Sequence, residues 1–250
     1  MEKISKAQVK LVRSLQQKKF RDELGLFVAE GDKCVEELCK RFELVHLYRE
    51  GENASRTEIE QMSGLRTPQG TIGVFRKHTI CDLKFDICDL TLALDGIQDP
   101  GNLGTIIRTA DWFGVRDIVC SLDTADCYNP KVVQATMGAL ARVRVHYVDL
   151  PKWLNEQINE KMVNGPMVNI FGTLLDGKDM YDVVSRSRGL DVSTTIIVMG
   201  NEGNGISPAV RSIITHPIRI PSYPKNAETS ESLNVAIATA VVLAEFRRNA

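Results

Sequence analysis

The sequence predicts an α/β protein in which a mostly parallel sheet is covered by helices and is preceded by a smaller α/β domain. Two observations support this fold class. From residue 91 onward, short apolar segments alternate with segments of helical periodicity, as expected for parallel strands joined by crossover helices. Residues 1–77 show a shorter alternation of the same kind. The segment 78–90 breaks the periodicity, so we expect domains at 1–77 and 91–250 joined by a linker at 78–90.

Composition sets broad limits on the class of protein. The chain has 250 residues, 43% hydrophobic and 25% charged, with a net charge of −1, which is ordinary for a globular protein. No apolar run reaches membrane-spanning length, and the basic N-terminus lacks the apolar core of a signal peptide. The six cysteines form no Cys-x-x-Cys pair, so we expect thiols in a reducing compartment and no zinc site. We therefore expect a cytoplasmic protein that uses neither membrane nor metal.

The first domain begins with a basic amphipathic helix, expected over 4–20, whose apolar residues recur at helical spacing. Strands at 26–31, 44–49 and 71–77 and helices at 32–41 and 57–62 are expected after it. Cations at the N-terminus and in this helix are candidate contacts for RNA phosphates: Lys3, Lys6, Lys10, Arg13, Lys18 and Lys19. From charge alone, a solvated helix face is the simpler interpretation.

The second domain alternates strands and helices to its end. We expect strands at 91–95, 115–122, 144–148, 167–175, 194–200 and 216–221. We expect helices at 104–113, 130–141, 151–163, 179–187, from Ser207, and at 232–248. Ligands of such folds bind at the carboxyl ends of the strands, where helix N-termini present unpaired N–H groups.

Glycine-rich turns follow two of these strands, with glycines at 101, 104, 200, 203 and 205 that permit close approach of a ligand to the backbone. A dinucleotide site would need G-x-G-x-x-G after the first strand of its unit. The GNEGNG turn at 200–205 has the reverse spacing, comes late, and contains Glu202, which would repel a pyrophosphate. The pattern therefore argues against a site for a nicotinamide cofactor. No G-x-x-x-x-G-K-[ST] phosphate loop occurs in the sequence either.

Three motifs in order carry a resemblance to a known family: PGNLGTIIRTA at 100–110, GNEGNGIS at 200–207, and IRIP with SLNVAIA between 218 and 238. Together they resemble the SpoU/TrmH branch of the SPOUT RNA methyltransferases. The FVAEGDKCVEEL and LRTPQGTIGVF segments are similar, more loosely, to the L30e-like substrate-binding domain of many relatives. The resemblance implies a deep trefoil knot in the second domain, a homodimer, and transfer of a methyl group from S-adenosylmethionine, leaving S-adenosylhomocysteine, to a ribose 2′-hydroxyl of RNA.

The resemblance also implies a cofactor site. Its expected members are Thr173, Leu174, Gly200, Glu202, Gly205, Ile220, Leu233 and Asn234. For Thr173 and Leu174, ordinary strand termination is an equally good explanation. Glu202 either caps backbone N–H groups or lies near the sulfonium, where a carboxylate favours the cation.

The expected catalytic residues are Arg108, Asn102, Glu202, Ser232 and Asn234. Because a guanidinium is essentially never deprotonated, Arg108 suits stabilisation of the developing oxyanion better than unaided base catalysis. Each residue also has a structural interpretation: Arg108 could pair with Asp111, Asn102 could be the N-cap of its helix, and Ser232 and Asn234 could cap the last helix.

The sequence departs from many relatives in one loop, where YPKNAETSE at 223–231 lengthens the connection by about four residues. The additional N-terminal domain favours ribosomal RNA as substrate. The alternatives are a tRNA 2′-O-methyltransferase and a non-catalytic RNA- or ribosome-binding protein that retains the fold.

Overall fold

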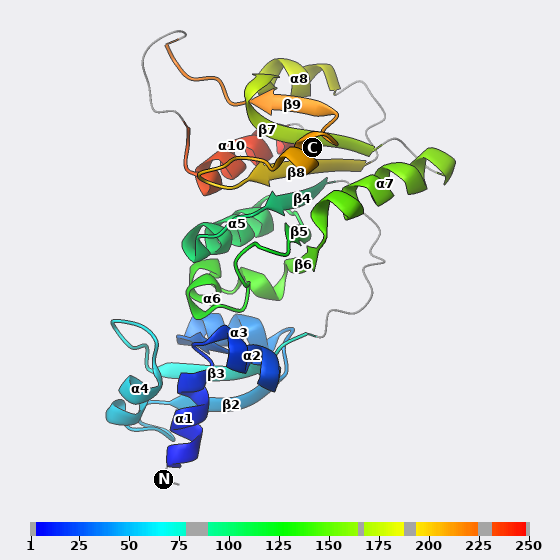
Figure 1. Ribbon diagram of the computed structural model, residues 1–250. Helices are drawn as coiled ribbons and strands as arrows, with labels where there is room; N and C mark the ends of the chain where they lie inside the picture. The colour runs from blue at the N-terminus through cyan, green and yellow to red at the C-terminus, as the bar shows by residue number, and fades with distance from the viewer. Residues whose placement is uncertain (1–3, 79–89, 165–167, 188–193, 225–231, 249–250) are drawn as a thin grey trace. The chain divides into compact units, whose positions relative to one another are not determined.

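The computed structural model describes residues 4–78, 90–164, 168–187, 194–224 and 232–248. Contacts divide the chain into two compact units (Figure 1). The first comprises residues 1–81 and 126–142, and the second comprises residues 82–125 and 143–250. The expected functional domains at 1–77 and 91–250 stay predictions, but the segment 126–142, expected in the second, groups with the first unit.

The first unit contains a three-stranded antiparallel sheet of order β1-β3-β2. Its strands are β1 (Leu26–Glu30), β2 (Leu44–Arg49) and β3 (Thr71–Arg76), and its helices before residue 78 are α1 (Lys6–Ser14), α2 (Lys18–Leu24), α3 (Asp32–Cys39) and α4 (Arg56–Met62). Alternate residues of the strands face opposite sides. Val28 and Val74 pack with α1 and α4, whereas Phe27 and Phe75 stack on the other face.

One helix was expected over 4–20, and this is wrong. Gln17 has extended backbone angles (φ −99°, ψ 132°), which separate α1 from α2. The guanidinium of buried Arg21 donates to the carbonyl groups of Leu15 and Gln16 at 2.9 and 3.0 Å. It also pairs with Asp126 at 2.7 Å. The break is therefore stabilised by a partner 105 residues away, which local periodicity could not reveal.

The segment 126–142 completes the first unit. Its helix α6 (Pro130–Thr136) packs on β1, and the Tyr128 ring lies 4.8 Å from that of Phe27. The expected helix at 130–141 ends early, because Met137 and Gly138 have positive φ angles of 51° and 89°. A short 3-10 helix, η1 (Ala139–Ala141), follows.

The second unit contains a six-stranded parallel sheet of order β6-β5-β4-β8-β7-β9. The strands are β4 (Leu90–Asp95), β5 (Asp117–Ser121), β6 (Arg144–Val148), β7 (Val168–Asp179), β8 (Thr194–Gly200) and β9 (His216–Arg219). The helices are α5 (Pro100–Trp112), α7 (Leu150–Asn164), α8 (Met180–Ser187), α9 (Pro208–Arg211) and α10 (Val235–Arg247). The expected α/β class with a parallel sheet is confirmed.

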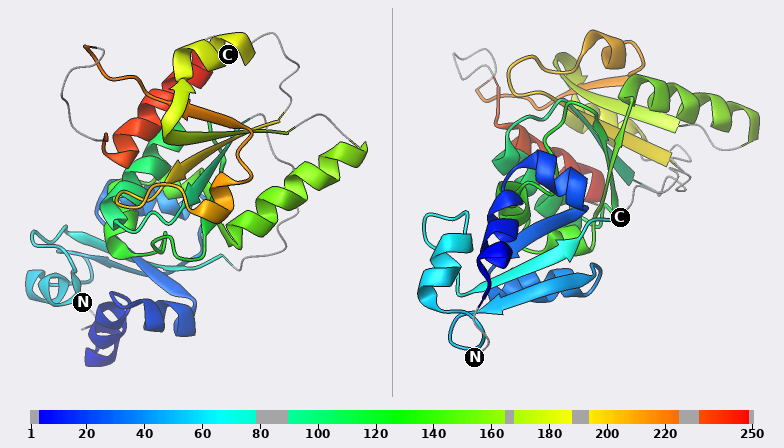
Figure 2. Two further views of the ribbon diagram at one scale, coloured as in Figure 1. Left: turned by 45° about the horizontal axis from the view of Figure 1, so that its top comes forward. Right: turned by 60° about the horizontal axis from the view of Figure 1, so that its bottom comes forward.

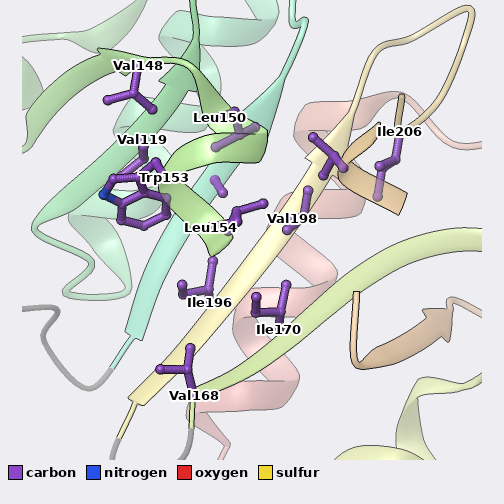
Figure 3. Close-up of a cluster of buried hydrophobic side chains, with 12 residues drawn as sticks. Val119, Val148, Leu150, Trp153, Leu154, Val168, Ile170, Ile196, Val198 and Ile206 are labelled. Atoms are coloured by element: carbon purple, nitrogen blue, oxygen red, sulfur yellow. The ribbon is translucent and has the colours of Figure 1, made fainter. Parts of the chain in front are cut away.

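Helices cover both faces of this sheet. Figures 1 and 2 show α5 and α10 side by side on one face and α7 on the other. Beneath α7, Trp153 and Leu154 pack on Val119, Ile170 and Ile196 (Figure 3). With both faces buried, the strands are nearly continuous apolar runs, which explains why they were readable in the sequence.

Two further features bear on the expectations. Residues 225–231, which connect β9 to α10, lie outside the described residues, so the trefoil knot and the effect of the lengthened loop stay predictions. No helix in the described ranges is long and apolar enough to cross a membrane.

Candidate active site

The site begins where β4 leads into α5. Asp99 is the N-cap of α5, and its side chain accepts a hydrogen bond from the N–H of Asn102 at 2.8 Å. Pro100 follows at the first helical position, where its missing N–H leaves no bond unmade. Asn102 therefore lies within the first turn of α5, and its interpretation as the N-cap is wrong. Its side chain is released for contacts elsewhere.

The turn after β8 forms a second side of the site. The Asn201 side chain donates to the Gly96 carbonyl at 2.6 Å and accepts from the N–H groups of Gly203 and Asn204 at 2.9 Å each. A Cβ atom on Gly200 would lie 2.4 Å from backbone atoms of Gly205 and Ile206. Only glycine fits at position 200, and the tight turn places Glu202 at its tip.

A chain of hydrogen bonds joins the three motifs. The Asn102 Nδ2 donates to Glu202 Oε1 at 2.9 Å, and the Asn234 Nδ2 donates to Asn102 Oδ1 at 2.9 Å. Asn234 is also the N-cap of α10, accepting from the N–H groups of Ala236 and Ile237. Since each amide donates in one direction and accepts in the other, the Glu202–Asn102–Asn234 chain has one orientation. Asn234 therefore caps α10 and also belongs to the site.

These side chains border a pocket of about 570 Å³. It is lined by Gln98, Asp99, Asn102, Asn201, Glu202, Gly203, Ser232, Leu233, Asn234 and Val235. The volume falls within the range of small-molecule sites, and the lining is mainly polar. Five residues expected from the sequence are among these: Asn102, Glu202, Ser232, Leu233 and Asn234. Asn201 was missed, although its place inside the glycine-rich turn was a usable signal.

Other expected cofactor residues lie near the same edge of the sheet but do not line this pocket. Gly200 and Gly205 shape the turn that carries Glu202. Thr173 donates to the Val198 carbonyl at 3.3 Å, and Leu174 packs on the core beneath α7. Ile220 is half-buried just after β9. Their cofactor roles stay predictions.

Arg108 is exposed on α5 and is not part of the pocket lining. No ion pair joins it to Asp111 within the described residues. Six residues after Asn102, it lies about 9 Å further along the helix. In a single copy of the chain, the residues that line the pocket therefore do not include Arg108.

The expected RNA contacts on the first unit differ from one another. Lys6, Lys10 and Arg13 are exposed and recur at three- and four-residue spacing, so they share one face of α1. Lys18 pairs with Asp22 at 2.6 Å, and the Lys19 ammonium lies 6.0 Å from the Phe20 ring centre. Lys3 lies outside the described residues.

Comparison with known proteins identifies the family. Residues 89–244 match the model of the SpoU rRNA Methylase family, which is more than half of the chain. The chain belongs to the SpoU family. Residues 6–63 of this SpoU-family chain match the MRM3-like substrate binding domain. The resemblance expected from the three motifs is confirmed.

Relatives span both units of this SpoU-family chain. It is 28% identical to the Bacillus subtilis 23S rRNA (guanosine(2553)-2′-O)-methyltransferase RlmP, covering 99% of this chain and 98% of that protein. A TrmH-family protein from Porphyromonas gingivalis superposes with a TM-score of 0.82 at 34% identity, covering 99% of both chains. An AdoMet-bound rRNA methyltransferase from Sinorhizobium meliloti superposes with a TM-score of 0.79 at 28% identity, covering 99% and 97%.

Proposed function

We propose that this chain is an S-adenosylmethionine-dependent RNA methyltransferase that modifies a ribose 2′-hydroxyl of ribosomal RNA. The observation that carries the proposal is the Glu202–Asn102–Asn234 chain, which brings one polar side chain from each of the three motifs to a single pocket. The pocket lies at the carboxyl ends of parallel strands, where this type of sheet binds ligands.

The residues present fit the cofactor. Bound S-adenosylmethionine would supply a methyl group activated by a positively charged sulfonium. Glu202 offers a carboxylate to that charge, and the absence of a side chain at Gly200 lets a flat ligand approach the backbone. Leu233, 49% exposed at the pocket wall, offers apolar surface. Thr173, Leu174, Gly205 and Ile220 complete the proposed cofactor set at the same edge.

The acceptor hydroxyl must be activated and positioned by the protein. A ribose hydroxyl is a poor nucleophile until its proton is removed or polarised. Arg108 keeps its charge throughout, so we assign it to stabilising the developing oxyanion. Asn102, Ser232 and Asn234 then position the nucleotide, since amide and hydroxyl groups both donate and accept hydrogen bonds.

A second copy of the chain would bring Arg108 to the pocket. It shares the exposed face of α5 with Trp112, which is 85% exposed. The adjoining helix α10 exposes Ile237 to 56%. Large apolar side chains on two packed helices are typical of an interface. We propose a homodimer through this face, in which Arg108 of one copy serves the pocket of the other.

The first unit would hold RNA by charge and shape. Lys6, Lys10 and Arg13 on α1 present a row of cations without described ion-pair partners, suited to successive phosphates. Ribosomal RNA is favoured because RlmP, which matches across both units, acts on 23S rRNA. The described cysteines at 34, 39, 120 and 127 carry thiols and not disulfides, in keeping with the cytoplasm as the compartment.

Two measurements test the proposal. Calorimetric titration with S-adenosylhomocysteine should give micromolar affinity, and labelled methyl groups should enter unmodified 23S rRNA transcripts in preference to tRNA transcripts. Transfer to tRNA alone would replace the substrate. No binding at millimolar cofactor would instead support the non-catalytic RNA-binding protein.

A further inference from the structure

An exposed leucine stands on the turn that follows β5, at the same edge of the sheet as the pocket. Leu122 is 72% exposed, whereas its neighbours Ser121 and Thr124 are only 7% and 6% exposed. A single exposed leucine on a flexible loop is common and needs no explanation. This one differs because the turn around it is fixed by hydrogen bonds.

Both ends of the turn are held. The N–H of Gly96 donates to Ser121 Oγ at 2.8 Å, and Ser121 Oγ donates to Asp123 Oδ1 at 2.6 Å. At the other end, the N–H of Ala125 donates to the Ile97 carbonyl at 2.8 Å, and its carbonyl accepts from the Tyr147 hydroxyl at 2.5 Å. The backbone that carries the Leu122 side chain is therefore held in one conformation.

The turn is also connected directly to the pocket wall. Gly96, which bonds to Ser121, accepts a hydrogen bond through its carbonyl from the Asn201 side chain at 2.6 Å. Asn201 lines the pocket. Two hydrogen bonds, through Gly96, thus connect Ser121 in the Leu122 turn to Asn201 in the pocket, where the acceptor ribose would be placed.

Chemistry favours a nucleobase as the partner of this side chain. A nucleotide that enters a protein pocket must first leave its stack, and proteins that distort nucleic acids often insert an apolar side chain between bases. The turn at 121–125 contains no lysine or arginine that could bind a phosphate, and its Asp123 carboxylate accepts a hydrogen bond from Ser121. The turn therefore offers RNA only the apolar side chain of Leu122 at its tip. Contact with a base face is what such a tip can provide.

We infer that Leu122 is an RNA-positioning residue that packs against the base next to the methylated nucleotide. The inference rests on the proposed function and deepens it. It specifies an acceptor within stacked, structured RNA and a contact that is independent of base identity, since every base has an apolar face. Leu122 acts on RNA alone and makes no contribution to cofactor binding.

The test compares Leu122→Ala, Leu122→Asp and Leu122→Met with wild type, using 23S rRNA transcript as substrate. We expect kcat/KM for RNA to fall about tenfold in Leu122→Ala and further in Leu122→Asp, as for loss of one apolar contact. Leu122→Met should stay within about threefold of wild type, because it keeps an apolar side chain of similar volume. The Kd for S-adenosylhomocysteine should be unchanged in all three, which also shows that they fold.

The possible failures are distinguishable. If wild type transfers methyl groups and Leu122→Ala and Leu122→Asp equal it, only the role of Leu122 is overturned. A raised Kd for S-adenosylhomocysteine, or a change in mass by light scattering, would assign Leu122 to the cofactor site or to a subunit interface and likewise overturn the inference. Wild type that methylates no RNA overturns the proposed function and this inference together.

Discussion

Replacing Asn102 with aspartate changes one donor atom at the centre of the Glu202–Asn102–Asn234 chain. The variant keeps the oxygen that accepts from Asn234 but faces Glu202 with a second carboxylate at about the present 2.9 Å. Losing a hydrogen bond to a charged group removes about 1.5–3 kcal/mol. Repulsion of two exposed carboxylates adds about 1 kcal/mol or more. We expect kcat/KM for methyl transfer to fall roughly 70- to 1000-fold, equivalent to about 2.5–4 kcal/mol.

The assay is kcat/KM for RNA, measured as the ratio of variant to wild type at pH 6 and pH 8.5. Two adjacent carboxylates share a proton more readily as the pH falls, and a protonated carboxyl group restores a donor toward Glu202. The deficit of Asn102→Asp should therefore narrow at pH 6, whereas that of Asn102→Ala should be the same at both pH values. Asn102→Asp activity within twofold of wild type at pH 8.5 would refute the role of the chain.

Three further predictions concern cofactor affinity and folding. Gly200→Ala places a Cβ atom 2.4 Å from backbone, so S-adenosylhomocysteine affinity should fall at least about tenfold by calorimetry; unchanged affinity would show that the turn yields. Arg21→Met removes a buried guanidinium from Asp126 and should lower the free energy of unfolding in urea by about 3–5 kcal/mol. The exposed-pair control Lys18→Met should lower it by less than about 1 kcal/mol, and equal losses would contradict the argument. Burial first, and Lys178 second, lower the pKa of His216 below its usual 6.5. The unfolded chain then binds the proton first, and stability should decrease as the pH falls below 6.5; this part of the decrease should be absent in His216→Phe.

The sequence could predict features that depend on near neighbours. Buried strands such as β4 and β8 are nearly continuous apolar runs, and the glycine-rich turn at 200–205 follows directly on one of them. The start of α5 was also readable, since Asp99 followed by Pro100 is a standard helix beginning. Placing that helix at 104–113 overlooked this signal and misassigned Asn102 as the cap.

Other features depend on residues that are distant in the sequence. Asn102 lies 100 residues from Glu202 and 132 from Asn234, so spacing alone could not show their hydrogen bonds. The break between α1 and α2 depends on Asp126, 105 residues from Arg21. The absence of Arg108 from the pocket lining likewise depends on how α5 packs in the fold.

The most direct test of the central claim is the chemical position of the transferred methyl group. Labelled S-adenosylmethionine would be incubated with unmodified ribosomal and transfer RNA and with wild type or Arg108→Ala, and the RNA would then be digested with alkali. A 2′-O-methyl group blocks cleavage of the adjoining phosphodiester. We predict label in alkali-stable dinucleotides from ribosomal RNA, greatly reduced for Arg108→Ala. Label in mononucleotides would mean base methylation and would contradict the assignment of the ribose hydroxyl as acceptor.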